Sequence, residues 1–444
     1  MPERQATIIA AMSVAAPSPI PKRAVYTLML INFVDLMGFG LVILLLPFYA
    51  VRFDANVFQI AALLSVYSAC QFLAAPILGT LSDRVGRRPV LMFSQWGSVV
   101  GYLVLALPAL FDWPPAVGLS VVFLSRIIDG FTAGNITVTN AYVSDVVAPK
   151  ERAGVMGLLG AAFGLGFALG PPIGGLLSEH VHPAAPGLLA ALLSGIASIM
   201  VWRFLPESHR THDRTGATGF AFAPTRMRSV AAQPMDVALS SVWFLCMLAY
   251  VMLEPTVPKI LIDQYKWSEG TAGIFYGCVG VIIILVQGGL VRPLNKRFGE
   301  WPLAFGGAVC GAIGLLLYAR VASVAPFFAL LAIAALFNAL GRSLQTPTLS
   351  AMLSQNSDPR AQGAVYGVYQ GMASLARVIG PLVGGAIYDR HPPATFVVGG
   401  GLLLVAAGVL VVIRPRLRTS HSLDPAIPEP PAKTVADTTG GVAS

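Results

Sequence analysis

The sequence predicts an all-α integral membrane protein with twelve transmembrane helices in two pseudo-symmetric six-helix halves. Three observations support this prediction. Of the 444 residues, 55% are hydrophobic and 11% are charged, whereas soluble domains carry roughly 25% charged residues. Twelve apolar runs are each long enough to cross a hydrocarbon core of ~30 Å as a helix. Two segments 210 residues apart also repeat one another.

The apolar runs form two groups of six on either side of a polar segment. The first group comprises 24–50, 60–81, 89–110, 117–142, 153–177 and 187–205, and the second comprises 237–261, 271–290, 303–319, 325–349, 363–387 and 395–413. Strands of a transmembrane barrel would instead be ~10 residues of alternating polarity. A barrel is therefore excluded.

The polar segments set the expected domain boundaries. We expect a cytoplasmic N-terminal tail (1–23), a first half (24–206), a cytoplasmic linker (207–236), a second half (237–414) and a disordered cytoplasmic tail (415–444). The last of these is polar and proline-rich, which is typical of disorder. The N-terminus lacks a basic start followed by a cleavable apolar core, so no signal peptide is expected.

The basic residues indicate the orientation. Of the 29 Lys and Arg, 21 fall on the side of the termini and the linker, while the opposite loops hold only Arg52, Lys266, Arg320 and Arg390. Basic residues mark the cytoplasmic side, so both termini are expected in the cytoplasm and the protein in the bacterial inner (cell) membrane. The net charge of +8 then reflects topology and predicts no nucleic-acid partner.

The repeat aligns without gaps and spans the fourth and fifth helices of each half. The matched pairs are Ala141 with Ala351, Ser144 with Ser354, Pro149 with Pro359, Gly157 with Gly367, Gly170-Pro171 with Gly380-Pro381, and Gly174-Gly175 with Gly384-Gly385. The halves are thus parallel repeats. Such repeats are typical of secondary transporters, whose substrate site lies between the halves near the membrane midplane. Rocking of one half against the other would expose that site to each side in turn.

Only three carboxylates lie well inside the expected spans: Asp35, Asp129 and Glu254. None of the six His does, so a titrating group in the translocation path is expected to be a carboxylate. Removal from water favours the neutral form of a carboxyl group. All three are therefore candidates for proton coupling. The structural alternatives are a hydrogen-bonding role for Asp35 and a water-filled outer vestibule around Glu254.

Arg126 lies on the same helix as Asp129, three residues away. A cation at this depth needs a counter-ion, so Arg126 is expected to pair with Asp35, Asp129 or both. Asp129 alone could neutralise it. Arg342 and Arg377 lie nearer the cytoplasmic ends of their spans, where their side chains could snorkel.

The loop between the second and third spans reads "GTLSDRVGRRPVL", from Gly79 to Leu91. Gly79 permits close backbone approach, Asp83 suits a helix N-terminus, and Arg87 could pair with an acid on a neighbouring helix. Asp145 follows Arg126 by 19 residues, or ~28 Å of helix, which places it at the same cytoplasmic end. The loop resembles the signature of the major facilitator superfamily, and this resemblance implies that Gly79, Asp83, Arg87 and Asp145 form a conformational latch; the alternative is a loop that only sets topology.

These segments resemble the major facilitator superfamily. "GTLSDRVGRRPVL" is similar to its loop signature, "LSRIIDGFTAGN" to its fourth-span motif, and "GAAFGLGFALGPPIGG" to the fifth-span motif of drug:proton antiporters. "FVDLMGFG" and "AYVSD" resemble the tetracycline-exporter branch. "RPLNKRFGEWPL" is a degenerate second-half copy of the loop signature without its acid. Some such exporters carry a His in the eighth span, where Ile283 stands here.

Two further sets of residues complete the expected sites. A hinge at the interface between the halves is expected at Gly166, Gly170, Pro171, Gly174 and Gly175, with ordinary tight packing as the alternative. Aromatic and polar residues that could line a substrate cavity are Tyr67, Gln71, Asn135, Tyr250, Tyr276, Gln287, Asn338 and Gln345.

The expected function is proton-coupled export of a small amphipathic compound, tetracycline-like or multidrug, by a monomer that requires no cofactor. Its partners would be the substrate, protons and the lipid bilayer. The alternative on the same fold is an importer or uniporter of a small metabolite. An enzyme is disfavoured because no His or Cys constellation and no nucleotide-binding loop accompanies the spans. The four Cys lie in four different spans without metal-type spacing. A channel is disfavoured by the unequal halves.

Overall fold

The computed structural model describes residues 22–43, 46–147, 149–208, 233–358 and 361–417. All regular secondary structure within these ranges is helical. The elements are α2 (Lys22–Ile43), α3 (Leu46–Val51), α4 (Val57–Val85), α5 (Arg87–Leu110), α6 (Pro115–Thr132), α7 (Asn135–Val146), α8 (Pro149–His180), α9 (Ala185–Phe204), α11 (Pro234–Val251), α12 (Leu253–Asp263), α13 (Glu269–Leu285), the π-helix η1 (Val286–Leu290), α14 (Val291–Phe298), α15 (Glu300–Val321), α16 (Phe328–Asn356), α17 (Gln362–Tyr388), α18 (Pro392–Ile413) and the 3₁₀ turn η2 (Arg414–Arg416).

Each expected span corresponds to one helix or to a consecutive group of helices. Eleven of these segments in the described chain are long and apolar enough to cross a membrane. The expected span 153–177 lies within α8, a helix of 32 residues. The first span corresponds to α2 and α3, which lie on either side of two residues outside the described set. The fourth is divided into α6 and α7 and the seventh into α11 and α12, and the eighth continues from α13 into η1.

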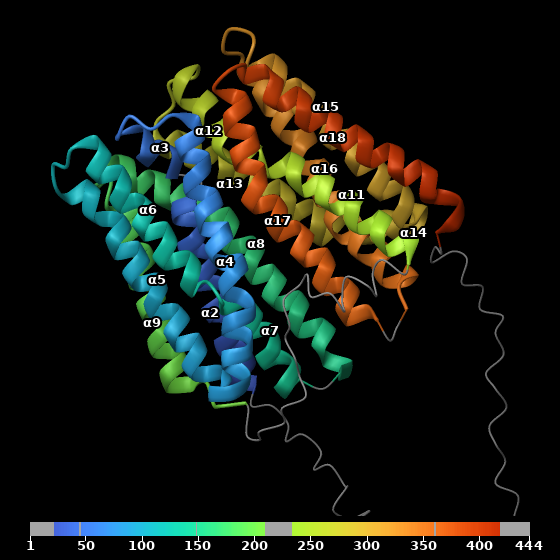
Figure 1. Cartoon of the computed structure of the whole chain (residues 1–444), viewed down its shortest axis with the longest axis horizontal. Coiled ribbons are helices and arrows are strands. Elements are labelled where there is room, and N and C mark those ends of the chain that lie inside the picture. The colour runs from blue at the N-terminus through green and yellow to red at the C-terminus, as the bar shows by residue number, and fades with distance from the viewer. Residues whose placement is uncertain (1–21, 44–45, 148, 209–232, 359–360, 418–444) are drawn as a thin grey trace, which may run out of the picture.

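The helices form two bundles, drawn blue to green and yellow to red in Figure 1. In the N-terminal half, α2 packs on α8 and α9, and α5 packs on α6 and α9. In the C-terminal half, α11 packs on α17 and α18, and α15 packs on α16 and α18. These contacts correspond pairwise, so the sequence repeat appears again as a repeat of packing.

Two helix pairs carry the main contacts between the halves: α8 with α13, and α4 with α17. Each pair joins the fifth span of one half to the second span of the other. Small residues allow this close approach. A Cβ at Gly385 of α17 would lie 2.8 Å from the Ala61 side chain and 3.0 Å from the Val57 carbonyl oxygen of α4.

Local sequence signals explain several helix ends. Asn56 and Gln59 form a reciprocal capping box at the start of α4, which satisfies two backbone donors. Gly86 separates α4 from α5 with φ of +103°, and Gly299 separates α14 from α15 with φ of +82°. Glycine adopts these angles without the penalty that a side chain brings. The two glycines occupy the corresponding loops of the two halves.

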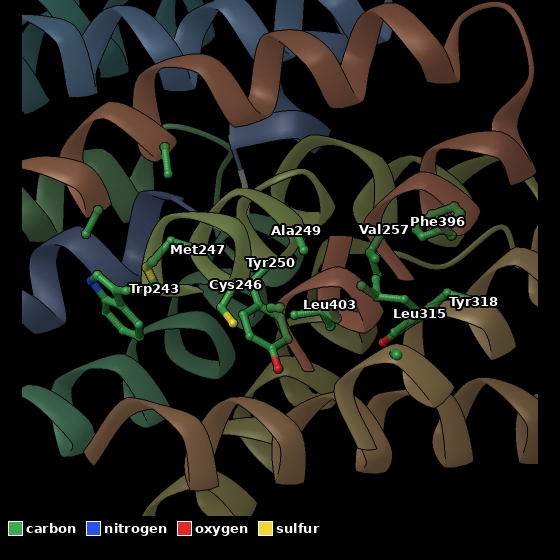
Figure 2. Packing of buried hydrophobic residues seen from close by; sticks show 14 of the residues in the cluster. Trp243, Cys246, Met247, Ala249, Tyr250, Val257, Leu315, Tyr318, Phe396 and Leu403 are labelled. Atoms are coloured by element: carbon green, nitrogen blue, oxygen red, sulfur yellow. The ribbon is translucent and has the colours of Figure 1, made fainter. Parts of the chain in front are cut away.

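The largest buried cluster fills the C-terminal half (Figure 2). Trp243 of α11 stacks on Tyr369 of α17 with ring centroids 5.0 Å apart. Many large apolar side chains elsewhere are exposed, including Ile77, Leu192 and Val412, as expected for helices that face lipid.

The expected tails and linker fall mostly outside the described residues. Helix α2 begins at Lys22, inside the expected tail 1–23, and α11 begins at Pro234, inside the expected linker 207–236. Only residues 415–417 of the expected disordered tail are described.

Candidate functional site

A cavity of about 210 Å³ lies between the two halves. It contains all three carboxylates expected inside the spans and four aromatic rings. Its lining from the N-terminal half is Asn32, Asp35, Leu36, Phe39, Ile43, Leu64, Tyr67, Ser68, Gln71, Ser98, Tyr102, Asp129, Ala133 and Phe167, and from the C-terminal half Glu254, Arg342 and Arg377. A cavity with apolar walls and a few convergent polar groups is typical of a small-molecule site.

Asp35 is held by a neighbouring helix of its own half. Its Oδ2 accepts a hydrogen bond of 2.6 Å from Nε2 of Gln95, which lies on α5. Gln95 is fully buried, whereas Asp35 is partly exposed in the cavity. A short N–H bond to a carboxylate stabilises its charged form. The sequence analysis did not identify Gln95.

Arg126 and Asp129 form a buried ion pair of 3.4 Å on α6. Arg126 is 1% exposed, and its guanidinium carbon lies 5.9 Å from the ring centroids of both Tyr67 and Tyr102. Ser98 donates a second bond to Asp129, at 2.9 Å. Of the two counter-ions expected for Arg126, this geometry pairs it with Asp129.

Helix α6 ends at the cavity, where α7 begins after a two-residue break at Ala133 and Gly134. The Ala133 carbonyl accepts a bond of 3.3 Å from Gln71 Nε2, which replaces a lost helical bond. A side chain at Gly134 would approach to 2.5 Å from Leu78. Discontinuous helices at a midplane cavity are typical of secondary transporters. The break lies inside the expected span 117–142, which did not predict it.

The charged groups of the C-terminal wall come from three helices. Glu254 lies on α12, directly after the break between α11 and α12, and Arg342 and Arg377 lie on α16 and α17. The possibility that both arginines snorkel to the membrane surface is wrong, because both line the cavity. The pattern of apolar residues could not predict that Arg342 and Arg377 face the cavity, because α16 and α17 are apolar on more than one face.

Of the expected cavity residues, Tyr67 and Gln71 form part of the lining and the other described side chains do not. Tyr250 donates a 2.8 Å bond to Gln345, and both are buried behind the cavity wall. Tyr276 packs edge-on against Phe275, and Gln287 is exposed on η1. Asn338 lies on α16, where its backbone packs close to Gly314. The side chain of Asn135 lies outside the described set.

The expected latch residues converge at one end of the N-terminal half. Arg87 lies 2.5 Å from Asp83 and 3.0 Å from Asp145, and donates to Ser82 at 2.6 Å. Arg87 is 6% exposed. Gly79 is buried on α4, and its carbonyl accepts a bond from Ser82 at 2.7 Å. All these partners belong to the N-terminal half.

Glu207 completes this cluster, although the sequence analysis did not single it out. Its two carboxylate oxygens accept bonds of 2.8 and 3.1 Å from the Arg87 and Arg88 backbone amides at the start of α5. An acid at a helix N-terminus is favourable because it satisfies free amides and opposes the helix dipole. The start of the linker is thereby attached to the loop.

The C-terminal half has a counterpart of the latch. Gln355, which the offset of 210 aligns with Asp145, donates to Glu300 at 3.1 Å. Glu300 follows Gly299 as Arg87 follows Gly86. The degenerate loop therefore keeps the connection between helix ends, with an amide in the place of Asp145 and an acid in the place of Arg87.

The opposite end of the bundle holds contacts that cross between the halves. Arg52 and Glu269 form an ion pair of 2.5 Å. Glu179, at the end of α8, accepts a bond of 2.9 Å from the Gly270 amide at the start of α13. Asp389, immediately after α17, accepts bonds of 3.3 and 3.1 Å from the Val57 and Phe58 amides at the start of α4.

The expected hinge residues lie where α8 meets α2 and α13. A Cβ at Gly166 would approach within 2.8 Å of the Met37 backbone nitrogen, and one at Gly170 within 2.6 Å of Gly40. One at Gly175 would clash with the Glu269 carbonyl oxygen, and Pro171 lies against Gly273 of α13. Gly174 is buried on the same helix. This glycine stripe of α8 therefore allows close packing both on α2 of its own half and on α13 of the other half.

Known proteins share this sequence and architecture. The family model described as Major Facilitator Superfamily matches residues 28–324 and 292–439. The class C tetracycline resistance protein of Escherichia coli is 32% identical over 389 residues, covering 85% of this chain and 93% of that protein. The class G tetracycline resistance protein of Vibrio anguillarum is 32% identical over 402 residues, covering 87% and 96%.

Solved structures show the same fold. The human organic anion transporter MFSD10 (TETRAN) has a TM-score of 0.65 at 24% identity, covering 88% of this chain and all of that chain. The nucleoside transporter NupG has a TM-score of 0.71 at 14% identity, covering 88% and 99%. The predicted all-α, twelve-helix architecture is confirmed, and so is the resemblance to tetracycline exporters. This multi-pass membrane protein belongs to the major facilitator superfamily of transporters.

Proposed function

We propose that the protein exports a small amphipathic compound, tetracycline-like or multidrug, in exchange for protons. The observation that carries this proposal is the cavity between the repeats, which holds carboxylates from both halves. The similarity to tetracycline resistance proteins supports export. The chain would act as a monomer in the bacterial inner membrane, with both termini in the cytoplasm.

Asp35 is the proposed coupling residue. Unlike Asp129, which forms a buried pair with Arg126, Asp35 bonds to a neutral amide and borders the cavity. Protonation would remove its charge and weaken the bond from Gln95, because a charged acceptor binds an N–H more strongly than a neutral one. Arg126 then balances Asp129 and need not exchange partners. Glu254 is a second candidate site.

In alternating access, one end of the bundle would open while the other end closes. All the hydrogen bonds and ion pairs described above that cross between the halves lie at the end marked by Arg52, Glu179 and Asp389. The charge bias favours the extracellular side for this end, so the structure would correspond to a state that is closed to the outside. Opening outward would separate these contacts, while the glycine stripe of α8 would move against α13. The latch around Arg87 would stabilise one of the states.

Proton and substrate movement in proteoliposomes tests this proposal. A tetracycline gradient imposed across vesicles that contain the purified protein should drive protons in the opposite direction, recorded with an entrapped pH dye. A protonophore should abolish uphill transport. Tetracycline movement without proton movement would indicate a uniporter, and movement of both in one direction a symporter; either result would refute proton-coupled export.

A further inference from the structure

Two arginines of the C-terminal half border the cavity, and neither forms an ion pair within 4.0 Å in the part of the chain that the structure describes. Arg342 and Arg377 are both partly exposed in the lining. Among the described residues, the ion pairs within 4.0 Å involve neither guanidinium group. A charge at membrane depth is costly unless it meets a partner or water. Two unpaired cations on one wall thus point to a ligand of opposite charge.

Glu254 balances only part of this positive charge. It lies within electrostatic range of both arginines, yet it makes no ion pair with either within 4.0 Å. One negative charge therefore faces two positive charges on this wall. The two arginines are also within electrostatic range of each other, so a shared anion would relieve their repulsion.

The position of Arg342 is supported by an aromatic ring of its own half. The Arg342 guanidinium lies 6.0 Å from the centroid of the Tyr250 ring. Tyr250 is fixed in turn by its 2.8 Å bond to Gln345. A side chain held in this way loses little freedom when a ligand binds.

The acids of the opposite wall already have partners in their own half. Asp129 pairs with Arg126 at 3.4 Å and accepts from Ser98, and Asp35 accepts from Gln95 at 2.6 Å. The cavity is thus divided, with positive charge in excess on the C-terminal wall. A substrate that spans it would place its negative end there.

We infer that Arg342 and Arg377 together bind an anionic oxygen group of the substrate, such as a carboxylate or an enolate. The planar guanidinium group suits two-point contact with such oxygens. Ionised Glu254 competes with the anion for the same two cations. This inference rests on the proposed function only in taking the cavity as the substrate site; it requires no particular direction of coupling.

Equilibrium binding of a matched pair of ligands tests the inference. The probes are 2-naphthoate and its neutral amide, 2-naphthamide, titrated against the purified full chain in detergent without a proton gradient. The wild-type protein should prefer naphthoate. Arg342→Gln and Arg377→Gln should each weaken naphthoate binding about tenfold or more, the effect of losing one charged hydrogen bond. Their binding of naphthamide should stay unchanged.

Three further variants sharpen the result. Glu254→Gln should strengthen naphthoate binding by removing its competitor. Arg342→Lys and Arg377→Lys should each retain part of the preference, because Lys keeps the positive charge but lacks the two-point geometry of the guanidinium group. Arg320→Gln changes an exposed arginine at the end of α15, outside the lining, and should bind as the wild type does.

Equal affinity for the two probes, equal losses for both in the Gln variants, or binding of neither by the wild type would overturn the inference. If naphthoate preference fails while tetracycline still drives proton flux, only the anion site is refuted. If the preference holds without proton flux, the site stands and proton-coupled export is refuted.

Discussion

Asp35 Oδ2 accepts a hydrogen bond of 2.6 Å from Gln95 Nε2 at the edge of the central cavity. The bond joins the first and third membrane helices of the N-terminal half. It supplies a donor to the charged acid without adding a cation. Protonation of Asp35 would weaken this bond to a neutral amide, whereas protonation of Asp129 would remove the carboxylate that pairs with the buried Arg126. We therefore propose Asp35, rather than Asp129, as the coupling residue.

The outer contacts predict a shift in conformation when a helix-capping acid is neutralised. Glu179 and Asp389 are 210 residues apart and cap α13 and α4 in the opposite halves. Glu179→Gln and Asp389→Asn should each weaken the closed outer end and increase the outward-open population several-fold. Distances between spin labels on the outer loops measure this population.

Asp112→Asn is the matched control for these variants, because Asp112 is an exposed acid in the loop between α5 and α6. The double variant should shift the population further than either single change. If the label distances in both single variants and in the double variant equal those of the wild type, Glu179 and Asp389 do not hold this end closed.

A second prediction concerns the glycines at the same interface. Gly385→Ala places a methyl group 2.8 Å from the Ala61 side chain, and Gly175→Ala would clash with the Glu269 carbonyl oxygen. Both should disfavour the closed outer end and lower transport rates markedly. Gly401→Ala adds its methyl group where no atom lies within 4 Å and should transport normally. Normal rates in the first two variants would show that the interface tolerates separation.

A third prediction addresses the latch. Asp83→Asn removes one of the two carboxylates on the buried Arg87 while Asp145 remains at 3.0 Å. The protein should stay folded, with changed inward-open and outward-open populations. Arg84→Gln, an exposed change in the same loop, should leave the populations alone. Unchanged label distances in Asp83→Asn would restrict this loop to setting topology.

Orientation gives a fourth prediction, which follows from the charge bias. In a variant without reactive native cysteines, Thr218→Cys should react only with a membrane-permeant reagent in intact cells. Ser323→Cys, exposed in a loop at the other end, should react with an impermeant one. The reverse pattern would invert the proposed orientation and the direction of every transport step.

The sequence predicted the spans well because hydrophobic length decides them, and this signal does not depend on tertiary packing. The break at Ala133 and Gly134 lies inside an expected span and no proline marks it, although Gly134 and Asn135 are residues that favour a helix end. Gln71 on another helix donates a hydrogen bond to the Ala133 carbonyl there.

The cavity lining was predictable only in part. Membrane acids are few, so Asp35, Asp129 and Glu254 stood out. Whether the side chain of Arg342, Tyr250 or Gln345 faces the cavity depends on the rotation of its helix about the helix axis. The sequence of an apolar helix hardly encodes this rotation, because lipid and protein interior are both apolar. The caps at Glu179 and Asp389 did carry a signal: they align at the repeat offset of 210, which was applied only to residues that are identical in the two halves.

The most direct test of the central claim is tetracycline-driven proton flux by Asp35→Asn in proteoliposomes, with binding measured on the same preparation. Asp54→Asn, an exposed acid in the loop after α3, is the control and should behave as the wild type. Asn resembles the protonated acid but cannot release a proton. Asp35→Asn should therefore bind tetracycline yet show neither proton flux nor uphill export. Wild-type proton flux and uphill export by a well-folded Asp35→Asn protein would contradict the claim and assign coupling to Glu254 or Asp129.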